Sequence, residues 1–206
     1  MKKISRLIAV VILLAGFASV AKAEFRWGAT AGVNITSLDF KQDLFKVTDG
    51  VGPVLGVQGE MMLPGIGFGF DVGAMYSMQG GGMNLGQWPI WEADGYGKEH
   101  SYLHTLSIPL DVRFKWTRMN GFEDYLAPFV FGGPIFNFTV AHNKMRAMDY
   151  AGGSIGIQAG LGVELFKRWQ LQGSYVWGMT YVMKAAKLQD YSARERYWTV
   201  RAVYFF

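Results

Sequence analysis

Side chains that could do chemistry are few in this sequence, and most of them are charges rather than nucleophiles. The chain has three histidines, His100, His104 and His142, and no cysteine, which excludes thiol catalysis and cysteine-based metal sites. A hydroxyl nucleophile needs a base within hydrogen-bond reach. His104 and Ser107 are three residues apart in a segment of strand periodicity, so they point to opposite faces. The sequence therefore favours a non-enzymatic protein, with a lipid-modifying hydrolase or acyltransferase as the weaker alternative.

Metal and cofactor sites are not expected either. The spacing of His100 and His104 would separate them by about 13 Å on a strand, too far to share an ion. The glycines at 80–82 lack the lysine and following helix of a phosphate-binding loop. We therefore predict no cofactor and no metal.

Charged residues at the polar positions of alternating segments are the strongest candidates for a site. Four are basic and four are acidic: Arg26, Glu60, Asp71, Asp111, Arg113, Lys115, Glu164 and Arg201. If these segments are the strands of a narrow barrel, as argued below, the eight charges lie in its interior. Charges buried in this way are tolerable only when they are paired. We predict that these eight form a buried ion-pair network that closes the interior. The alternative is a proton or ion path gated by the same groups.

The elements that must position these charges are eight segments with an apolar–polar period of two. The predicted strands cover residues 25–36, 52–63, 67–78, 102–116, 125–140, 151–165, 169–181 and 197–206. Long connections at 39–50, 80–99, 141–149 and 183–193 alternate with three short turns. This asymmetry predicts an all-β protein, one eight-stranded antiparallel up-and-down barrel. In the fifth segment, Gly132-Gly133-Pro134 predicts a bulge.

The apolar face of these strands indicates that the barrel lies in a membrane. The polar face consists mostly of small or uncharged residues, which suit the inside of a narrow barrel, whereas a soluble lipocalin-type barrel would carry a charged outer face. Aromatic residues fall near both strand ends, as expected for rings at two interfaces. The first set is Trp27, Phe68, Trp116, Trp169 and Tyr204, and the second is Tyr76, Tyr102, Tyr181 and Trp198. We therefore predict a transmembrane barrel in contact with outer-membrane lipid.

The first 23 residues have the pattern of a signal peptide. Basic residues precede an apolar run at 8–20, and Ala21-Lys22-Ala23 is a small-x-small cleavage motif. We predict cleavage between Ala23 and Glu24, with a barrel domain at 24–206; an uncleaved anchor is the alternative. The formal charge of +4 comes from this leader, because 16 basic residues face 16 acidic ones after it. The charge therefore gives no reason to expect a nucleic-acid partner.

Four segments resemble the PorT-like family of outer-membrane β-barrel domains. They are residues 27–35 (WGATAGVNI), 102–110 with Tyr102-Leu103 and Leu106-Ser107-Ile108-Pro109-Leu110, 128–134 with Pro128-Phe129-Val130 and Gly132-Gly133-Pro134, and 160–164 (GLGVE). The resemblance covers the whole mature chain and implies an outer-membrane barrel of a Gram-negative bacterium. It also implies, as an alternative role, a partner in a secretion complex.

The two ends of the chain carry further expectations. Tyr204-Phe205-Phe206 is similar to the C-terminal aromatic signal of barrel proteins, with Tyr204 and Phe206 as its key positions. That similarity implies recognition by the barrel-assembly machinery after delivery by periplasmic chaperones. An even strand count with short turns places both termini in the periplasm and the long loops outside the cell.

The loop at 80–99 is the remaining candidate for function. Trp88-Pro89-Ile90-Trp91 places large apolar groups beside charges, and exposed aromatic residues are typical binding anchors. The alternative is that Trp88 and Trp91 pack over the barrel mouth. We predict a structural or surface-interaction role with an extracellular ligand. A narrow transport pore, or a subunit of a secretion or transport complex, is the second prediction.

Overall fold

The computed structural model describes residues 24–40, 47–65, 67–84, 97–143, 148–185 and 192–206. These residues form nine strands and one short 3₁₀ turn, η2. The elements are β1 (Glu24–Phe40), β2 (Val47–Met62), β3 (Phe68–Asn84), β4 (Lys98–Lys115), η2 (Phe122–Asp124), β5 (Leu126–His142), β6 (Met148–Tyr150), β7 (Gly153–Leu165), β8 (Trp169–Ala185) and β9 (Ser192–Phe205). In these parts of the chain no helix is long and apolar enough to cross a membrane.

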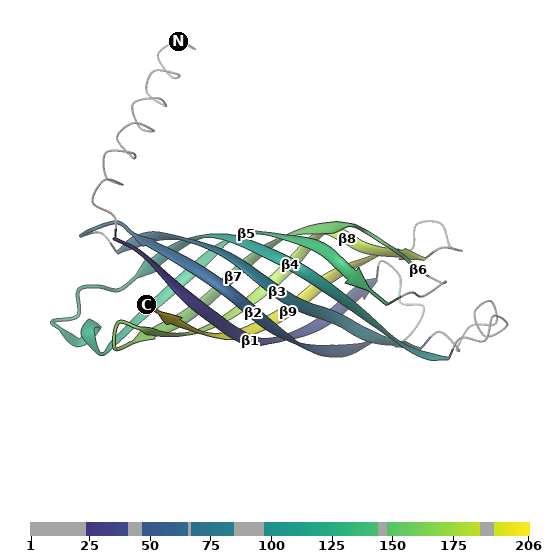
Figure 1. The fold of residues 1–206 in the computed structure, drawn as a ribbon, viewed down its shortest axis with the longest axis horizontal. Coiled ribbons are helices and arrows are strands. Elements are labelled where there is room, and N and C mark those ends of the chain that lie inside the picture. Colours follow the sequence, from purple (N-terminus) through teal and green to yellow (C-terminus); the bar gives the residue numbers. More distant parts are fainter. Residues whose placement is uncertain (1–23, 41–46, 66, 85–96, 144–147, 186–191) are drawn as a thin grey trace, which may run out of the picture.

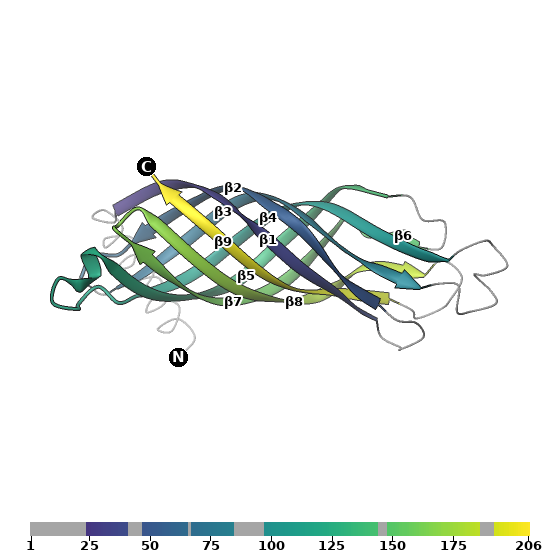
Figure 2. The ribbon, with the colours of Figure 1, turned by 90° about the horizontal axis from the view of Figure 1, so that it is seen from below.

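The strands form a closed, entirely antiparallel barrel with eight strand positions in its wall. The hydrogen-bonded order is β6-β8-β7-β5-β4-β3-β2-β1-β9, and a further pairing between β8 and β9 closes the ring. The short strand β6 pairs with β8 beyond the start of β7, so β6 and β7 together occupy one wall position. The two views at right angles show the same tilted, closed wall (Figures 1 and 2). In the described residues each wall position is therefore paired with a neighbour on both sides, which satisfies most backbone groups within the sheet.

The two ends of the barrel differ. Residue Glu24 and the C-terminus lie at one end, together with the connections β2–β3, β4–β5 and β7–β8 (Figure 1). We call this the turn end and the opposite one the loop end. The wall strands have 13 to 18 residues, whereas about 9–11 tilted residues span a bilayer. The strands therefore extend beyond the hydrocarbon region.

The sequence underestimated the strands at the loop end. The connections predicted at 39–50, 80–99 and 183–193 are shorter, because β1 continues to Phe40, β3 to Asn84 and β8 to Ala185, and β9 begins at Ser192. Outward-facing residues need to be apolar only where a strand crosses the bilayer. Hydrophobic alternation therefore marks the membrane-spanning part of a strand and not its full length. Backbone pairing needs no apolar side chain, and Gly81 and Gly82 pair with both β2 and β4.

The predicted bulge at Gly132-Gly133-Pro134 is wrong. These residues pair in unbroken register with Ala159, Gln158 and Ile157 of β7. The irregularity between β4 and β5 lies instead at His104 and Thr105. Gly133 is present for another reason: a Cβ there would lie 2.0 Å from the carbonyl oxygen of Leu110. The glycine permits close approach of two strands.

Side chains divide between the two faces of the wall as the period-two pattern predicts. In β1, Thr30 and Asn34 are buried in the lumen, whereas Trp27, Val33 and Ile35 are exposed on the outside. Aromatic rings contact one another across strands on the outer face at the turn end, with centroids 4.9 Å apart for Phe68–Phe114 and 4.8 Å apart for Trp169–Tyr204. A further such contact, Tyr175–Trp198 at 4.8 Å, lies on β8 and β9 nearer the loop end. Along the middle of the barrel, polar side chains such as Thr30 and Asn34 therefore line the lumen, and these aromatic rings lie outside it.

Candidate functional site

Glu60 is the centre of a buried charge network in the half of the lumen nearest the turn end. Its carboxylate is fully buried and accepts from Arg26 (Nη2–Oε1, 2.7 Å), from Lys115 (Nζ–Oε1, 2.9 Å) and from Arg113 through Oε2. Gln170 of β8 donates its amide to the same carboxylate at 2.6 Å. Strands β1, β2, β4 and β8 thus meet on one carboxylate.

Two further carboxylates complete the network. Glu164 of β7 accepts from Lys115 (Nζ–Oε2, 2.9 Å) and also pairs with Arg26. Asp71 of β3 accepts from Arg113, whose Nε lies 2.8 Å from Oδ2. Arg113 has no solvent-exposed surface and lies over the ring of Phe129, with its Cζ 4.0 Å from the ring centroid. Three cations and three carboxylates are therefore joined directly, which is the condition for burying so many charges.

Asp111 and Arg201 lie in the lumen beside this network but bond to neutral groups. Asp111 accepts from the amide of Gln158 at 2.6 Å. Arg201 donates its Nε to Gln172 at 2.7 Å and lies over the ring of Phe131 at 5.5 Å. All eight predicted charges thus face the interior. Six of them are joined by ion pairs, and these two are held by hydrogen bonds.

A polar layer fills the lumen beyond the charges, and it contains one carboxylate that the sequence reasoning missed. Glu195 of β9 is 1% exposed. The Gln79 side chain is oriented with its amide nitrogen toward Glu195. This nitrogen donates to both carboxyl oxygens of Glu195 (3.0 and 3.1 Å), and the Gln79 amide oxygen accepts from the hydroxyl of Tyr197. The sequence signal for this residue is its spacing, because residue 195 is an even number of positions from Arg201 and therefore points to the same face of the strand. It was overlooked because the predicted strand began at 197.

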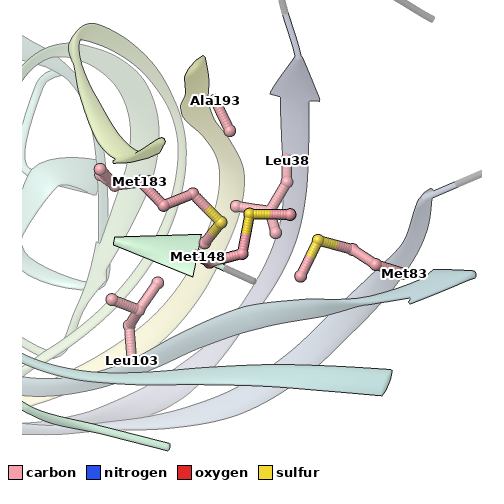
Figure 3. Close-up of a cluster of buried hydrophobic side chains, with 7 residues drawn as sticks. Leu38, Met83, Leu103, Met148, Met183 and Ala193 are labelled. Atoms are coloured by element: carbon pink, nitrogen blue, oxygen red, sulfur yellow. The ribbon is translucent and has the colours of Figure 1, made fainter. Parts of the chain in front are cut away.

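Apolar side chains close the lumen at the loop end. The cluster consists of Leu38, Met83, Leu103, Met148, Val182, Met183 and Ala193, which we call the methionine cluster. Figure 3 shows these side chains converging from β1, β3, β4, β6, β8 and β9. Each member is at most 4% exposed. Methionine is flexible and fills irregular gaps well, so the cluster packs densely where the barrel ends.

A cavity of about 240 Å³ remains at the turn end, directly outside the charge network. Its lining includes Arg26, Glu60, Lys115, Glu164 and Lys167. The exposed pair between Lys167 and Asp124 (Nζ–Oδ1, 2.7 Å) lies at its rim. The network therefore forms the inner boundary of this cavity.

Comparison with known proteins assigns this closed, ion-paired barrel to a family. Residues 17–184 match the family model described as outer membrane protein beta-barrel domain. The chain belongs to this family. It is therefore an outer-membrane β-barrel protein. The narrower resemblance to PorT-like domains stays a prediction, and no curated protein sequence matches the chain.

Solved structures of other outer-membrane barrels have the same fold at low sequence identity. OprG from Pseudomonas aeruginosa is 12% identical, with a TM-score of 0.53 over 89% of this chain and 95% of that one. A major outer membrane protein from Thermus thermophilus is 15% identical, with a TM-score of 0.51 over 89% of this chain and all of its own. At these identities the likeness concerns the fold alone.

Two of the histidines of this outer-membrane barrel contact tyrosine side chains. His104 lies on the outer face, where its Nδ1 is 2.5 Å from the hydroxyl of Tyr76. Ser107 is buried on the lumen side of the same strand. His142 stacks on Tyr150 with ring centroids 4.1 Å apart. Among the residues with described positions, no group of three or more metal-binding side chains comes together.

The remaining predicted sites lie partly outside the described residues. Trp88, Trp91 and Ala23 fall there, as does the whole predicted leader. Glu24 is the first residue of β1 and lines the turn-end cavity. At the other terminus, Phe206 donates its backbone N–H to the carbonyl of Trp27 (3.0 Å), and Tyr204 packs against Trp169. The C-terminal residues thus close the seam between β9 and β1.

Proposed function

We propose that this outer-membrane barrel is a non-conducting, non-enzymatic scaffold whose role lies in what its loop end presents. The observation that carries this proposal is closure of the lumen at two separate levels. Ion pairs around Glu60 and Arg113 fill the turn half, and the methionine cluster fills the loop end. A conducting barrel needs a continuous wetted path, whereas the interior of an eight-stranded barrel is only wide enough for side chains to fill.

Conductance of the refolded mature protein in planar bilayers tests this proposal. We expect no step currents from the wild type. The charge-neutral double variant Glu60→Ala with Arg113→Ala should also stay silent, because the methionine cluster still closes the loop end. Adding Leu103→Ala and Met183→Ala should produce current. Steady wild-type conductance would reject the scaffold and favour a narrow transport pore.

A silent barrel could serve as a subunit of a secretion complex, and the PorT-like resemblance favours this second candidate. Cross-linking in intact cells followed by purification of the tagged barrel separates the two roles. A stoichiometric periplasmic or outer-membrane partner would support the subunit role. Recovery of the barrel with the assembly machinery alone, through Tyr204 and Phe206, would support the independent scaffold.

The absence of catalysis belongs to the same proposal. His104 and Ser107 lie on opposite faces of β4, so neither can activate the other. Lipid A from cells with and without the gene should therefore have the same mass spectrum. Loss or gain of one acyl chain on expression would show that this barrel is a lipid-modifying enzyme.

A further inference from the structure

One place in the barrel wall lacks its regular backbone ladder. Strand β7 pairs with β8 only as far as Gly156–Gly178, and β6 resumes the pairing at Tyr150–Met183. Within the gap, Ile155 donates its backbone N–H to the side-chain oxygen of Thr180 (2.9 Å) and not to a carbonyl. A hydroxyl therefore replaces part of the backbone ladder here, and the Ala151 backbone N–H donates to the carbonyl of Val182 (2.8 Å) at the far side of the gap.

A cavity of about 470 Å³ lies over this gap. Its apolar lining comes from Phe136, Phe138, Ile155 and Tyr181, and its polar lining includes Asn137, Ser154 and Thr180. Phe138, Ile155 and Tyr181 are 50%, 44% and 44% exposed on the outer face. The cavity thus opens toward lipid, and its volume is in the range of small-ligand sites.

The inner side of the cavity holds an unused hydrogen-bond acceptor. Asn137 and Ser154 are the buried members of the lining, at 3% and 8% exposure. The Asn137 amide nitrogen makes two long bonds, to Ser154 (3.4 Å) and to Tyr197 (3.3 Å), whereas its oxygen has no partner. Leaving a buried acceptor unpaired is unfavourable. The terminal torsion of an asparagine is soft, so the amide of Asn137 can adjust to a ligand in the cavity that it lines.

The described lining of the cavity is uncharged and offers no partner to an ionic ligand. Asn137, Ser154 and Thr180 supply the polar groups of the lining, and none of them carries a charge that could pair with an anionic head group. On the outer side, the ammonium of Lys184 lies 4.2 Å from the ring centroid of Tyr181 and would repel a cationic one. The site therefore suits a neutral head group.

We propose that this cavity binds a neutral, hydroxyl-bearing amphiphile taken from the membrane. Its aliphatic chain lies against Phe136, Phe138 and Ile155. Its hydroxyl donates to the oxygen of Asn137 and accepts from the hydroxyl of Thr180, because a hydroxyl can do both at once. The proposal goes beyond the scaffold function and holds whether or not the lumen conducts.

Photo-labelling of the folded barrel in phosphatidylcholine nanodiscs tests the site. The probe is a long-chain alcohol with a diazirine in its chain, and mass spectrometry maps the labelled residues. Label should concentrate on β5, the start of β7 and β8. At equal concentration in the membrane, 1-octanol should compete at a roughly ten-fold lower concentration than methyl octyl ether, which lacks the donor. Equal competition by the two, or label spread evenly around the wall, would overturn the proposal.

Substitutions in the cavity lining separate specific binding from a general disturbance of the barrel wall. Ile155→Trp should fill the cavity and reduce labelling at least five-fold, whereas Ile157→Trp, two residues along the same outer face, should leave it unchanged. Asn137→Leu should keep the labelling but abolish the preference for octanol over the ether. Labelling that survives Ile155→Trp in full would reject the site. Wild-type competition decides the question even if a variant fails to fold.

Discussion

Glu60 shows how single residues make a charged lumen tolerable. The register places Glu60 opposite both Arg26 of β1 and Asp71 of β3, and Asp71 lies opposite Asp111 of β4. Three carboxylates on adjacent strands would repel one another in a medium of low dielectric constant. Arg113 bonds to two of them and separates their charges. The network is therefore cooperative, with each cation shared between carboxylates.

Removing the shared carboxylate should destabilise the barrel strongly. Glu60→Ala leaves Arg113 and Lys115 with one carboxylate partner each in the buried lumen, and breaking a buried pair costs about 3–5 kcal/mol. Urea unfolding of the barrel in phospholipid vesicles should show a loss of that size. Asp124→Ala is the control. Its carboxylate raises the pKa of Lys167 through a hydrogen bond and its charge, but the pair lies in solvent. Equal destabilisation of both variants would contradict the central role of Glu60.

The alternation of apolar and polar residues was sufficient to place the eight charges in the lumen, because successive side chains of a strand point to opposite faces. It could not say which charges meet. Lys115 and Glu164 lie on strands that are not neighbours and pair across the lumen, so their contact depends on barrel diameter and tilt. Arg201 was expected to share the ion pairs, yet Gln172 on the adjacent strand reaches it first. Side-chain reach decides these contacts.

Strand pairing at the element scale depends on glycines where two strands approach closely. Gly133 of β5 lies beside the backbone of β4, and its pairing with β7 continues without a break. The run Gly132-Gly133-Pro134 is unusual in a strand, and two explanations fit it. A bulge and a close approach both require glycine, and only the three-dimensional register separates them.

A methyl group at this position should therefore weaken the barrel wall. In Gly133→Ala the new Cβ would meet the Leu110 carbonyl at 2.0 Å, so β4 and β5 must separate locally. We expect a loss of about 3 kcal/mol, at the upper part of the overpacking range. The matched control is Gly173→Ala in β8, where a Cβ meets no atom within 4 Å. Thermal unfolding followed by the gel shift between folded and unfolded forms measures both. A wild-type midpoint for Gly133→Ala would refute the close approach.

At the scale of the whole molecule, the two ends of the barrel are closed by different chemistry. The turn end has charges that line an open cavity, and the loop end has the methionine cluster. The sequence predicted the first closure but not the second. Four of the seven cluster residues lie in segments that were predicted as loops, whereas Leu103 lies in a predicted strand; the four are Met83, Met148, Met183 and Ala193.

We expect the short turns to face the periplasm, and this direction of the barrel in the membrane is open to a direct test. The chain has no cysteine, so a single introduced thiol reports its own position. We expect a membrane-impermeant maleimide to label Gly97→Cys in intact cells, because residue 97 precedes β4 at the loop end, where a side chain meets no neighbour. Arg168→Cys, in the exposed β7–β8 turn, should react only after the outer membrane is permeabilised. The reverse pattern would place the termini outside the cell and remove the loop end from the extracellular face. The scaffold role proposed for that end would then fail, because an end inside the cell envelope cannot meet an extracellular ligand.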